Sequence, residues 1–401
     1  MLSVEEARKR VLEAVGVVEA EETPLIDALG LTLAEDAVAR NNIPPFDNSA
    51  MDGYAVRSAD VSCASRDNPV ELEVLGDLAA GYATEVSVGR GQALRIMTGA
   101  PMPAGADAVV PVELTRAQGD RVLILDCVSE GTNVRRAGED VKDGETVLAA
   151  GMAIGPAELG MLASLGYAKP RCFRRVRAGI ISTGDELVAV DEELAPGKIR
   201  DSNSYTLFGM VREAGAEPLR LGVVRDDADL LERTILDNLE RVDLFITSGG
   251  VSVGDYDMVK DVLGKLGEMN FWKVAMRPGK PQAFGHIGGK PLFGLPGNPV
   301  SVMVSFEQFV RPAILRMMGR REIFRPQVTA VLDAPMGRKE GRMEFVRVIV
   351  EWRDGRYHAR PTGPQGSSIL KSMVLGNALA VLPEDVGRLE PGAEVTVQLL
   401  R

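Results

Sequence analysis

The chain has 401 residues, of which 45% are hydrophobic, and its formal net charge is −11 at pH 7. This length suits about two to four domains, and no run of about 18 apolar residues predicts a membrane span. The negative charge argues against non-specific binding to nucleic acid or to an acidic membrane. An anionic ligand must therefore be attracted locally, by backbone N–H groups, a few lysines and arginines, or a metal ion.

Histidine and cysteine usage narrows the kinds of site that can occur. The only histidines are His286 and His358, which disfavours a histidine-centred triad or a multi-histidine metal site. Cys63, Cys127 and Cys172 lie far apart and form no CxxC pair, so they predict neither a disulfide framework nor a zinc motif. The N-terminal sequence lacks the pattern of a secretory signal, and we expect a cytoplasmic protein.

The N-terminal half predicts a helical domain that is interrupted by strands. Residues 1–40 have apolar residues at helical spacing, and a second helical stretch is expected from Thr23 to Leu29. Residues 41–140 contain short β-prone runs between glycine-rich turns. Residues 141–175 include another helical run, AELGMLASLG. We therefore predict a helical linker domain, formed by 1–40 and 141–175, with a β-rich domain inserted at 41–140.

The C-terminal half predicts two further domains. Residues 176–320 alternate strands and helices, as in a doubly wound α/β domain. Residues 321–401 are β-prone, and Asp354-Gly355 is a hairpin signal. The predicted fold class is multidomain, α/β plus β, with a C-terminal β-barrel-like domain. Within the α/β domain we expect strands at 177–182, 218–224, 243–247, 284–287 and 291–295, and helices at 201–214, 227–239 and 300–318.

Glycine-rich loops follow three of the predicted parallel strands, at 183–186, 248–257 and 294–301. Ligands of open parallel sheets bind beyond the carboxyl ends of the strands, and a helix that starts there favours an anion. An ordinary turn is the alternative for each loop. The candidate binding residues in the second and third loops are Ser248, Gly249, Gly250, Ser252, Gly297, Asn298 and Ser301.

Carboxylates near these strand ends suggest a metal ion. Glu186, Asp226 and Asp257 each follow or neighbour a strand end, and oxygen ligands favour hard cations such as magnesium. The alternative is local capping, with Asp185 in a turn and Asp226 at the start of the helix that follows.

A basic cluster occurs in the stretch FWKVAMRPGKP at 271–281. It consists of Lys273, Arg277 and Lys280, and at strand spacing the first two would fall on one face. A solvated edge strand is the alternative interpretation.

The stretch PFDNSAMDGYAVR at 45–57 is unusually polar for a structural loop. Dense polar loops on a rigid scaffold are often functional, although turn chemistry alone also explains Asp-Asn and Asp-Gly pairs. The same two interpretations apply to the polar loops at 98–101 and 135–140.

Together these loops resemble the MoeA family of molybdopterin molybdenumtransferases over essentially the whole chain. The matching stretches follow the family's order, and they are PFDNSAMDGYAVR, RIMTGAPMPAGADAVV, RRAGEDV, STGDEL, GVVRDD, SGGVSVGDYD, FWKVAMRPGKP and GLPGNPVS. The resemblance implies an L-shaped homodimer of four-domain chains, in which the α/β domain is MogA-like, similar to the small enzymes that adenylylate molybdopterin.

The resemblance also implies a reaction. Adenylylated molybdopterin and molybdate are the expected substrates and Mg²⁺ the expected cofactor; AMP is released and molybdenum passes to the dithiolene sulfurs. The site would lie between the α/β domain of one subunit and the β-rich domain of the other. Transient contacts with molybdopterin adenylyltransferase and apo-molybdoenzymes are further expectations, whereas nucleic acid and membrane are not expected as partners.

Site residues carry over from the family by match. The expected catalytic residues are Asp52, Thr98, Asp140, Glu186, Asp226 and Asp257, of which the last three would hold metal. The expected binding residues are Lys273, Lys280, Pro296, Pro299 and Ser367. Arg277 departs from the family, because a lysine stands there in relatives; the arginine keeps the charge and presents a planar fork suited to oxyanions, but it supplies no deprotonated amine.

Two other functions remain open from sequence alone. A molybdopterin adenylyltransferase shares the α/β domain, but the small enzymes lack the long N-terminal half and the β-rich C-terminus. A scaffold related to the gephyrin E domain would bind a partner peptide without molybdate-dependent activity. The intact set of carboxylates and lysines favours the transferase.

Overall fold

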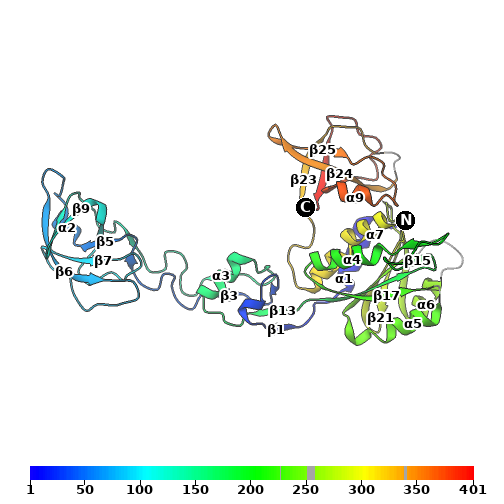
Figure 1. Ribbon diagram of the computed structural model, residues 1–401, viewed down its shortest axis with the longest axis horizontal. Helices are drawn as coiled ribbons and strands as arrows, with labels where there is room; N and C mark the ends of the chain where they lie inside the picture. The colour runs from blue at the N-terminus through cyan, green and yellow to red at the C-terminus, as the bar shows by residue number, and fades with distance from the viewer. Residues whose placement is uncertain (226, 251–257, 338–340) are drawn as a thin grey trace. The chain divides into compact units, whose positions relative to one another are not determined.

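The computed structural model describes residues 1–225, 227–250, 258–337 and 341–401, and Figure 1 labels its elements. The chain divides into two compact units. One comprises Met1–Glu35, Gly151–Pro156 and Lys169–Arg401, and the other Asp36–Ala150 and Ala157–Ala168. Within the described residues, every helix is too short or too polar to span a lipid bilayer.

The first unit contains the expected doubly wound α/β domain. Its six-stranded sheet has the order β17-β14-β18-β22-β21-β19, in which the first four strands are parallel and β21 pairs antiparallel with both β22 and β19. The central strands are buried almost completely, as expected of a sheet covered on both faces. The strands are β14 Arg177–Thr183, β17 Glu217–Val224, β18 Leu244–Ser248, β19 Gly267–Lys273, β21 Pro281–Ile287 and β22 Lys290–Leu295.

Helices cover both faces of this sheet (Figure 1). One face packs against α4, α7 and α8, and the other against α5 and α6. Asp201 accepts from the Ser204 N–H at 3.0 Å and so caps α4. The cap of α5 is Asp227, which accepts from the Leu230 N–H at 3.0 Å, whereas Asp226, suggested from the sequence as a cap, lies outside the described residues. The helices are α4 Asn203–Glu213, α5 Ala228–Leu236, α6 Met258–Leu266, α7 Pro299–Ser305 and α8 Arg311–Met317, with a π-turn Phe306–Val310 between the last two.

The N-terminal segment differs from its prediction. The helix α1, Val4–Ala14, places Val4, Ala7 and Val11 in the core of the α/β domain, not in a separate linker. The expected helix from Thr23 to Leu29 is only the 3₁₀ turn Leu25–Asp27. Pro24 is extended (ψ 134°) and Gly30 has a φ of 80°, so there is room for one turn only. This part of the chain instead contributes to a small sheet, formed by β1 Ala20–Glu22, β13 Arg171–Phe173 and β2 Thr32–Leu33.

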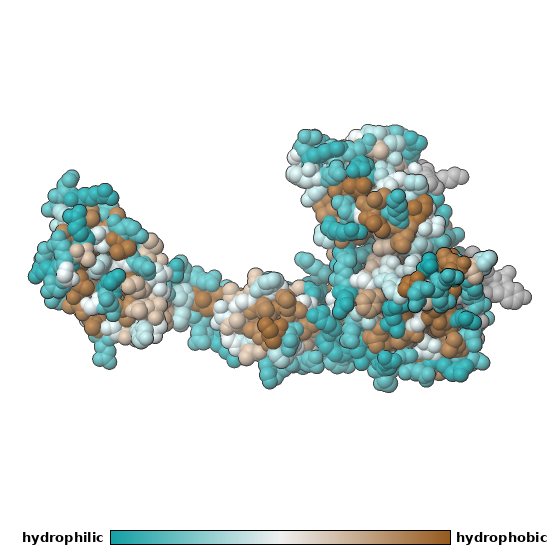
Figure 2. Space-filling model, in the orientation of Figure 1, coloured by the Kyte–Doolittle hydropathy of each residue, from teal (hydrophilic) through white to brown (hydrophobic). Residues whose placement is uncertain are grey.

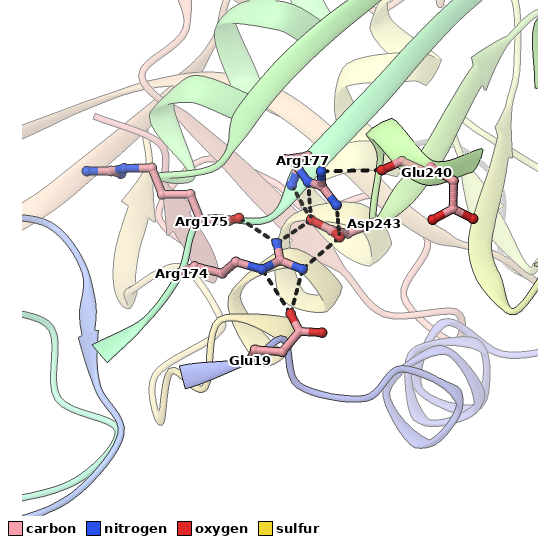
Figure 3. A network of polar contacts seen from close by, with 6 residues as sticks. All are labelled: Glu19, Arg174, Arg175, Arg177, Glu240 and Asp243. Atoms are coloured by element: carbon pink, nitrogen blue, oxygen red, sulfur yellow. Dashed lines mark hydrogen bonds and ion pairs between the residues drawn. The ribbon is translucent and has the colours of Figure 1, made fainter. Parts of the chain in front are cut away.

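An ion network joins this small sheet to the α/β domain (Figure 3). Asp243, only 5% exposed, accepts from the Arg174 guanidinium at 2.6 and 2.9 Å. It also accepts from the side chain and backbone of Arg177, while Arg174 pairs with the exposed Glu19 at 2.7 Å. Burial opposes ionisation of Asp243, but the hydrogen bonds from both arginines outweigh it and hold the pKa of the carboxyl well below its usual range.

The C-terminal domain is a closed barrel, as the sequence predicted. Its strands pair in a ring, β24-β25-β23-β27-β26, because β26 returns to β24. Asp354 (φ 51°) and Gly355 (φ 77°) form the expected two-residue hairpin turn between Arg353 and Arg356. The strands are β23 Gln327–Leu332, β24 Met343–Arg353, β25 Arg356–Pro361, β26 Ala378–Leu382 and β27 Glu394–Leu399, and the helix α9 Lys371–Leu375 lies in the connection between β25 and β26.

A short strand, β20 Met276–Arg277, connects this barrel to the α/β domain. It belongs to the α/β segment of the chain, yet it pairs in parallel with β24, with Arg277 opposite Glu344. The two domains therefore share backbone hydrogen bonds at this point.

The second unit is β-rich. Its main sheet has the order β8-β5-β7-β6-β10-β9 and encloses two small apolar clusters. All three cysteines of the chain are free, with Cys63 and Cys127 exposed and Cys172, in the first unit, buried. Burial raises the pKa of the Cys172 thiol to about 11. The elements are β3 Ala37–Val38, β4 Asn48–Ser49, β5 Gly53–Val56, α2 Ser58–Val61, β6 Val70–Leu78, β7 Gln92–Ile96, β8 Ala108–Pro111, β9 Thr115–Gln118, β10 Arg121–Ile124, β11 Val134–Arg135, β12 Thr146–Leu148 and α3 Pro156–Ser164.

Candidate functional site

The carboxyl ends of β14, β18 and β22 lie side by side, so the loops after them meet at one sheet edge. The Gly249 N–H donates to the Leu295 carbonyl at 3.1 Å, and the Thr183 hydroxyl contacts the Ser248 carbonyl at 3.4 Å. Gly249 has a φ of 103°, and a Cβ there would lie 2.6 Å from the Thr183 carbonyl oxygen. Only glycine permits this close approach of the first and second loops.

Asn203, at the start of α4, ties two of these loops together. Its amide Nδ2 donates to the Ser248 hydroxyl at 2.8 Å and to the Gly297 carbonyl at 2.7 Å. The amide orientation is determined by the carbonyl, because a flipped oxygen would face another acceptor. Sequence reasoning did not single out Asn203, since its role depends on partners far along the chain.

A pocket of about 400 Å³ opens where the α/β domain meets the barrel. The β20–β21 turn, the β22–α7 loop and two segments of the C-terminal domain form its walls. Its lining residues are Met276, Arg277, Pro278, Gly279, Lys280, Pro281, Pro296, Asn298, Ser301, Arg342, Gln365, Gly366 and Ser367.

The charge of this pocket is positive. Arg277, Lys280 and Arg342 line it, and none of the described lining residues is acidic. Glu344 is not among the lining residues, but its Oε1 lies 3.8 Å from Arg277 Nε. A chain with a net charge of −11 thus has a concave site suited to an oxyanion.

The β20–β21 turn is held rigidly against α7. Gly279 has a φ of 98°, and a Cβ there would lie 2.7 Å from the Ser305 hydroxyl. The buried Gln282 amide donates to both the Gly279 carbonyl and the Ser305 hydroxyl at 2.6 Å. The turn therefore presents Lys280 from a well-ordered backbone.

The start of α7 differs from what the loop sequence suggested. We expected its N–H groups to contact an anion, but the Val300 N–H donates to the Ser367 carbonyl at 3.0 Å. Pro299, the first residue of α7, has no N–H. The contribution of this loop to the pocket comes instead from Pro296, Asn298 and the 4% exposed Ser301.

Several expected site residues lie outside this pocket. Lys273 ends β19 in one sheet, whereas Arg277 lies in β20 and pairs with another, so the prediction that they share a strand face was wrong. Ser248, Gly249, Gly250 and Glu186 also do not line it. Asp226, Ser252 and Asp257 fall outside the described residues. Within the described residues, no three metal-ligand side chains of the His, Cys, Asp and Glu type gather in one place.

The second unit brings three further sequence motifs together. Asp52 Oδ1 accepts from both the backbone N–H and the hydroxyl of Thr98 at 2.7 Å. These bonds hold the pKa of the exposed Asp52 carboxyl below its ordinary value. The 98–101 loop is attached to the 45–57 loop by Ser49, whose backbone bonds to Gly99 and Ala100.

The third motif joins this cluster through Asp47, a residue that we had treated only as part of a turn. Asp47 accepts from the Ala137 N–H at 2.8 Å and from the Arg136 guanidinium at 2.6 Å, which lowers the pKa of its carboxyl. The Asp140 side chain is exposed, and its backbone N–H donates to the Ile43 carbonyl.

Comparison with protein families finds the same origin for all parts of the chain. Residues 2–166 match the MoeA N-terminal region (domain I and II). Residues 179–316 match a probable molybdopterin binding domain. Residues 329–400 match the MoeA C-terminal region (domain IV).

Individual relatives match over their full length. Molybdopterin molybdenumtransferase 2 of Mycobacterium tuberculosis (strain ATCC 25618 / H37Rv) is 42% identical over 99% of both chains. Molybdopterin molybdenumtransferase of Bacillus subtilis (strain 168) is 40% identical over all of this chain and 94% of its own. The crystal structure of the molybdopterin biosynthesis moeA protein from Pyrococcus horikoshii OT3 covers both chains completely, with a TM-score of 0.85 and 33% identity. The chain belongs to the MoeA family of molybdopterin molybdenumtransferases, and it is a transferase.

Proposed function

We propose that this chain completes molybdenum cofactor biosynthesis by inserting molybdenum from molybdate into adenylylated molybdopterin, with release of AMP. The observation that carries the proposal is the pocket at the sheet edge, which has three cationic side chains and no acidic residue among its described lining. The full-length similarity to molybdopterin molybdenumtransferases supports the same substrates. The cysteine usage, with three separated cysteines and no CxxC pair, supports a cytoplasmic location.

The chemistry requires two anions to meet. Arg277, Lys280 and Arg342 offset the charge of molybdate, and Ser301 and Ser367 lie where a hydroxyl can donate to its oxygens. Arginine suits this position because its planar guanidinium can donate hydrogen bonds to two oxygens of one anion. Holding molybdate in place lowers the entropic cost of its reaction with the pterin dithiolene.

The pterin and its phosphates would extend from this pocket along the sheet edge. Asn203 holds the Ser248 and Gly297 loops there, and Lys273 ends the edge strand β19, which β21 separates from β22. The oxygen donor at the end of β14 is Glu186, whose carboxylate folds back close to Gly184. This donor type fits Mg²⁺, with Asp226 and Asp257 as the further proposed ligands. A bound Mg²⁺ supplies charge neutralisation on the pyrophosphate.

The β-rich unit contributes Asp52, Thr98 and Asp140 to the proposed reaction. Two hydrogen bonds from Thr98 orient the Asp52 carboxylate and keep it ionised. We propose that these residues act on the substrate bound to the partner subunit of a homodimer. The exposed apolar side chains Val17, Ile26 and Leu29 suit such self-association, and Figure 2 shows hydrophobic residues gathered around β1 and β13. We further propose that contacts with molybdopterin adenylyltransferase and apo-molybdoenzymes are transient.

A reconstituted assay tests the function directly. The purified chain, given adenylylated molybdopterin, molybdate and Mg²⁺, should release AMP and form a product that activates an apo-molybdoenzyme. Prior treatment with EDTA should suppress AMP release, and added Mg²⁺ should restore it. Formation of adenylylated molybdopterin from ATP would identify the chain as an adenylyltransferase instead. Full turnover in EDTA would eliminate the role of the metal but not that of the pocket.

Complementation between two inactive variants tests the shared site. Asp52→Asn should lower kcat by at least about tenfold, and Lys280→Met should lower kcat/KM for molybdate by about 30-fold to 100-fold, each without loss of the dimer. Each mixed dimer has one site with both wild-type residues and one site with neither. Because random mixing makes about half of the dimers mixed, about a quarter of wild-type activity should return. Sedimentation velocity verifies that mixed dimers form. Mixed dimers that stay inactive would place Asp52 and Lys280 in the site of one subunit or in separate sites.

A further inference from the structure

One wall of the pocket comes from a connection in the C-terminal barrel. Gln365, Gly366 and Ser367 line the pocket, and they lie between the end of β25 at Pro361 and the start of α9 at Lys371. This segment belongs to neither element, so its position depends on the side chains that hold it.

The Gln365 side chain attaches this segment to β24 as an additional rung of the sheet. Its Oε1 accepts from the Arg347 N–H at 2.9 Å, and its Nε2 donates to the Arg347 carbonyl at 3.1 Å. The ladder between β24 and β25 ends one residue away, at Val348 and Pro361. The amide thus extends the end of the ladder, where the Arg347 carbonyl also accepts from the Thr362 N–H at 3.1 Å.

The Arg347 side chain holds the same segment from inside the domain. It is only 2% exposed and does not line the pocket. Its Nη2 donates to the Gly366 carbonyl and its Nε to the Ser372 hydroxyl, each at 3.1 Å. Ser372 in turn donates to the Ile369 carbonyl at 2.7 Å. One buried guanidinium therefore binds both the segment, at Gly366, and the helix α9 that follows it, at Ser372.

The opposite side of the segment contacts the α/β domain. The Ser367 carbonyl accepts from the Val300 N–H at 3.0 Å, and the neighbouring Ser301 lines the pocket. The wall is thus clamped between the barrel strand and α7, with its position set from both sides.

We propose that Arg347 and Gln365 are positioning residues that set the width of the oxyanion pocket by holding Gly366 and Ser367 against α7. The inference rests on the proposed function of the pocket, because it concerns how tightly the same site grips molybdate. Neither side chain needs to contact the anion, since both are engaged with the protein. Their effect passes through the backbone of the wall.

The chain supplies a matched control on the same strand. The Asn377 amide accepts from the Val350 N–H at 2.7 Å and donates to the Val350 carbonyl at 2.9 Å. This is the same paired contact as that between Gln365 and Arg347, also on β24, but Asn377 does not line the pocket. Substitution of Gln365 or of Asn377 should therefore cost similar stability. Only Gln365 borders the pocket, so an effect on molybdate binding that is specific to the pocket should appear at Gln365 alone.

The test compares Gln365→Met with Asn377→Leu in the full-length protein, using molybdate as the probe in isothermal titration calorimetry. Gln365→Met should raise the Kd for molybdate about tenfold, because small displacements of a binding wall are costly. Asn377→Leu should leave it within about twofold. In turnover, Gln365→Met should raise KM for molybdate while kcat at saturating molybdate stays near wild type.

Several outcomes would overturn the inference. Lower kcat with unchanged KM in Gln365→Met would indicate loss of folded protein only, and an equal rise of Kd in Asn377→Leu would indicate a general effect. Arg347→Lys retains a buried charge but is too short to serve both Gly366 and Ser372, so it should shift Kd in the same direction as Gln365→Met. A wild-type Kd in this variant would remove Arg347 from the proposal.

The proposed function is separately testable in the same experiment through Lys280→Met. If this variant and the wild type bind molybdate equally, the pocket is not the molybdate site and the proposed function fails. If Lys280→Met weakens binding while Gln365→Met does not, only the positioning role fails.

Discussion

Replacing Lys280 by methionine should lower kcat/KM for molybdate by about 30-fold to 100-fold. A charge-assisted hydrogen bond is worth about 2–3 kcal/mol in such a site, and each 1.4 kcal/mol corresponds to about tenfold. Lys280 extends from a turn that Gly279 and Gln282 hold against α7. The loss should therefore appear in binding, and the fold should remain intact. Steady-state AMP release at varied molybdate concentrations measures it.

The matched control is Lys290→Met. Lys290 begins β22, whereas Lys280 lies near the end of the sheet where that strand finishes. Both substitutions change the net charge of the protein equally. A difference in kcat/KM for molybdate between them therefore reports the local charge of the pocket and not the overall charge of the protein. Equal losses in the two variants would contradict an oxyanion site at Lys280.

Asp243→Asn should lower the free energy of unfolding by about 3 kcal/mol at pH 7. Removing one partner of a buried ion pair leaves the other charge without compensation. Here Arg177 loses its carboxylate partner, and Arg174 keeps only the exposed Glu19. Urea-induced unfolding followed by circular dichroism measures the difference. Glu19→Gln is the control, because Glu19 pairs with the same Arg174 from an exposed position and should cost at most about 1 kcal/mol.

The stability difference at Asp243 should depend on pH in one direction. Its pKa is lower in the folded protein than in the unfolded chain, so ionised Asp243 contributes its full stability above the unfolded value of about 3.9. That contribution decreases as the pH falls from there toward the folded pKa. The gap between wild type and Asp243→Asn should accordingly be constant from neutral pH to about 5 and narrow on further acidification. A gap that widens in acid would contradict the assignment.

Local sequence patterns predicted the elements well where one feature was sufficient. The carboxyl ends of β14, β18 and β22 meet because parallel strands align, and glycine spacing revealed their loops. The Asp354-Gly355 turn and the Asp201 cap follow from intrinsic backbone preferences. Each of these depends on residues close together in the chain.

The errors arose where distant partners decide the structure. Lys273 and Arg277 have strand spacing, but the chain leaves one sheet between them and joins another. One error had a local cause instead: the pattern from Thr23 to Leu29 is helical, yet Pro24 and Gly30 leave room for one turn only. Gln365 reaches the pocket through its bonds to Arg347 on β24, and Arg342 reaches it from the start of that strand. No local pattern encodes such an arrangement.

The pairing of β20 with β24 has a consequence for how this protein can be recombined. Arg277 is encoded with the α/β domain, but its backbone is registered on Glu344 of the barrel. A chimera that joins residues 176–320 of one relative to the barrel of another would combine two halves of a single anion-binding surface. We expect such hybrids to fold and yet to lose affinity unless both parents share the residues at this seam, so the two domains should be inherited as one functional module.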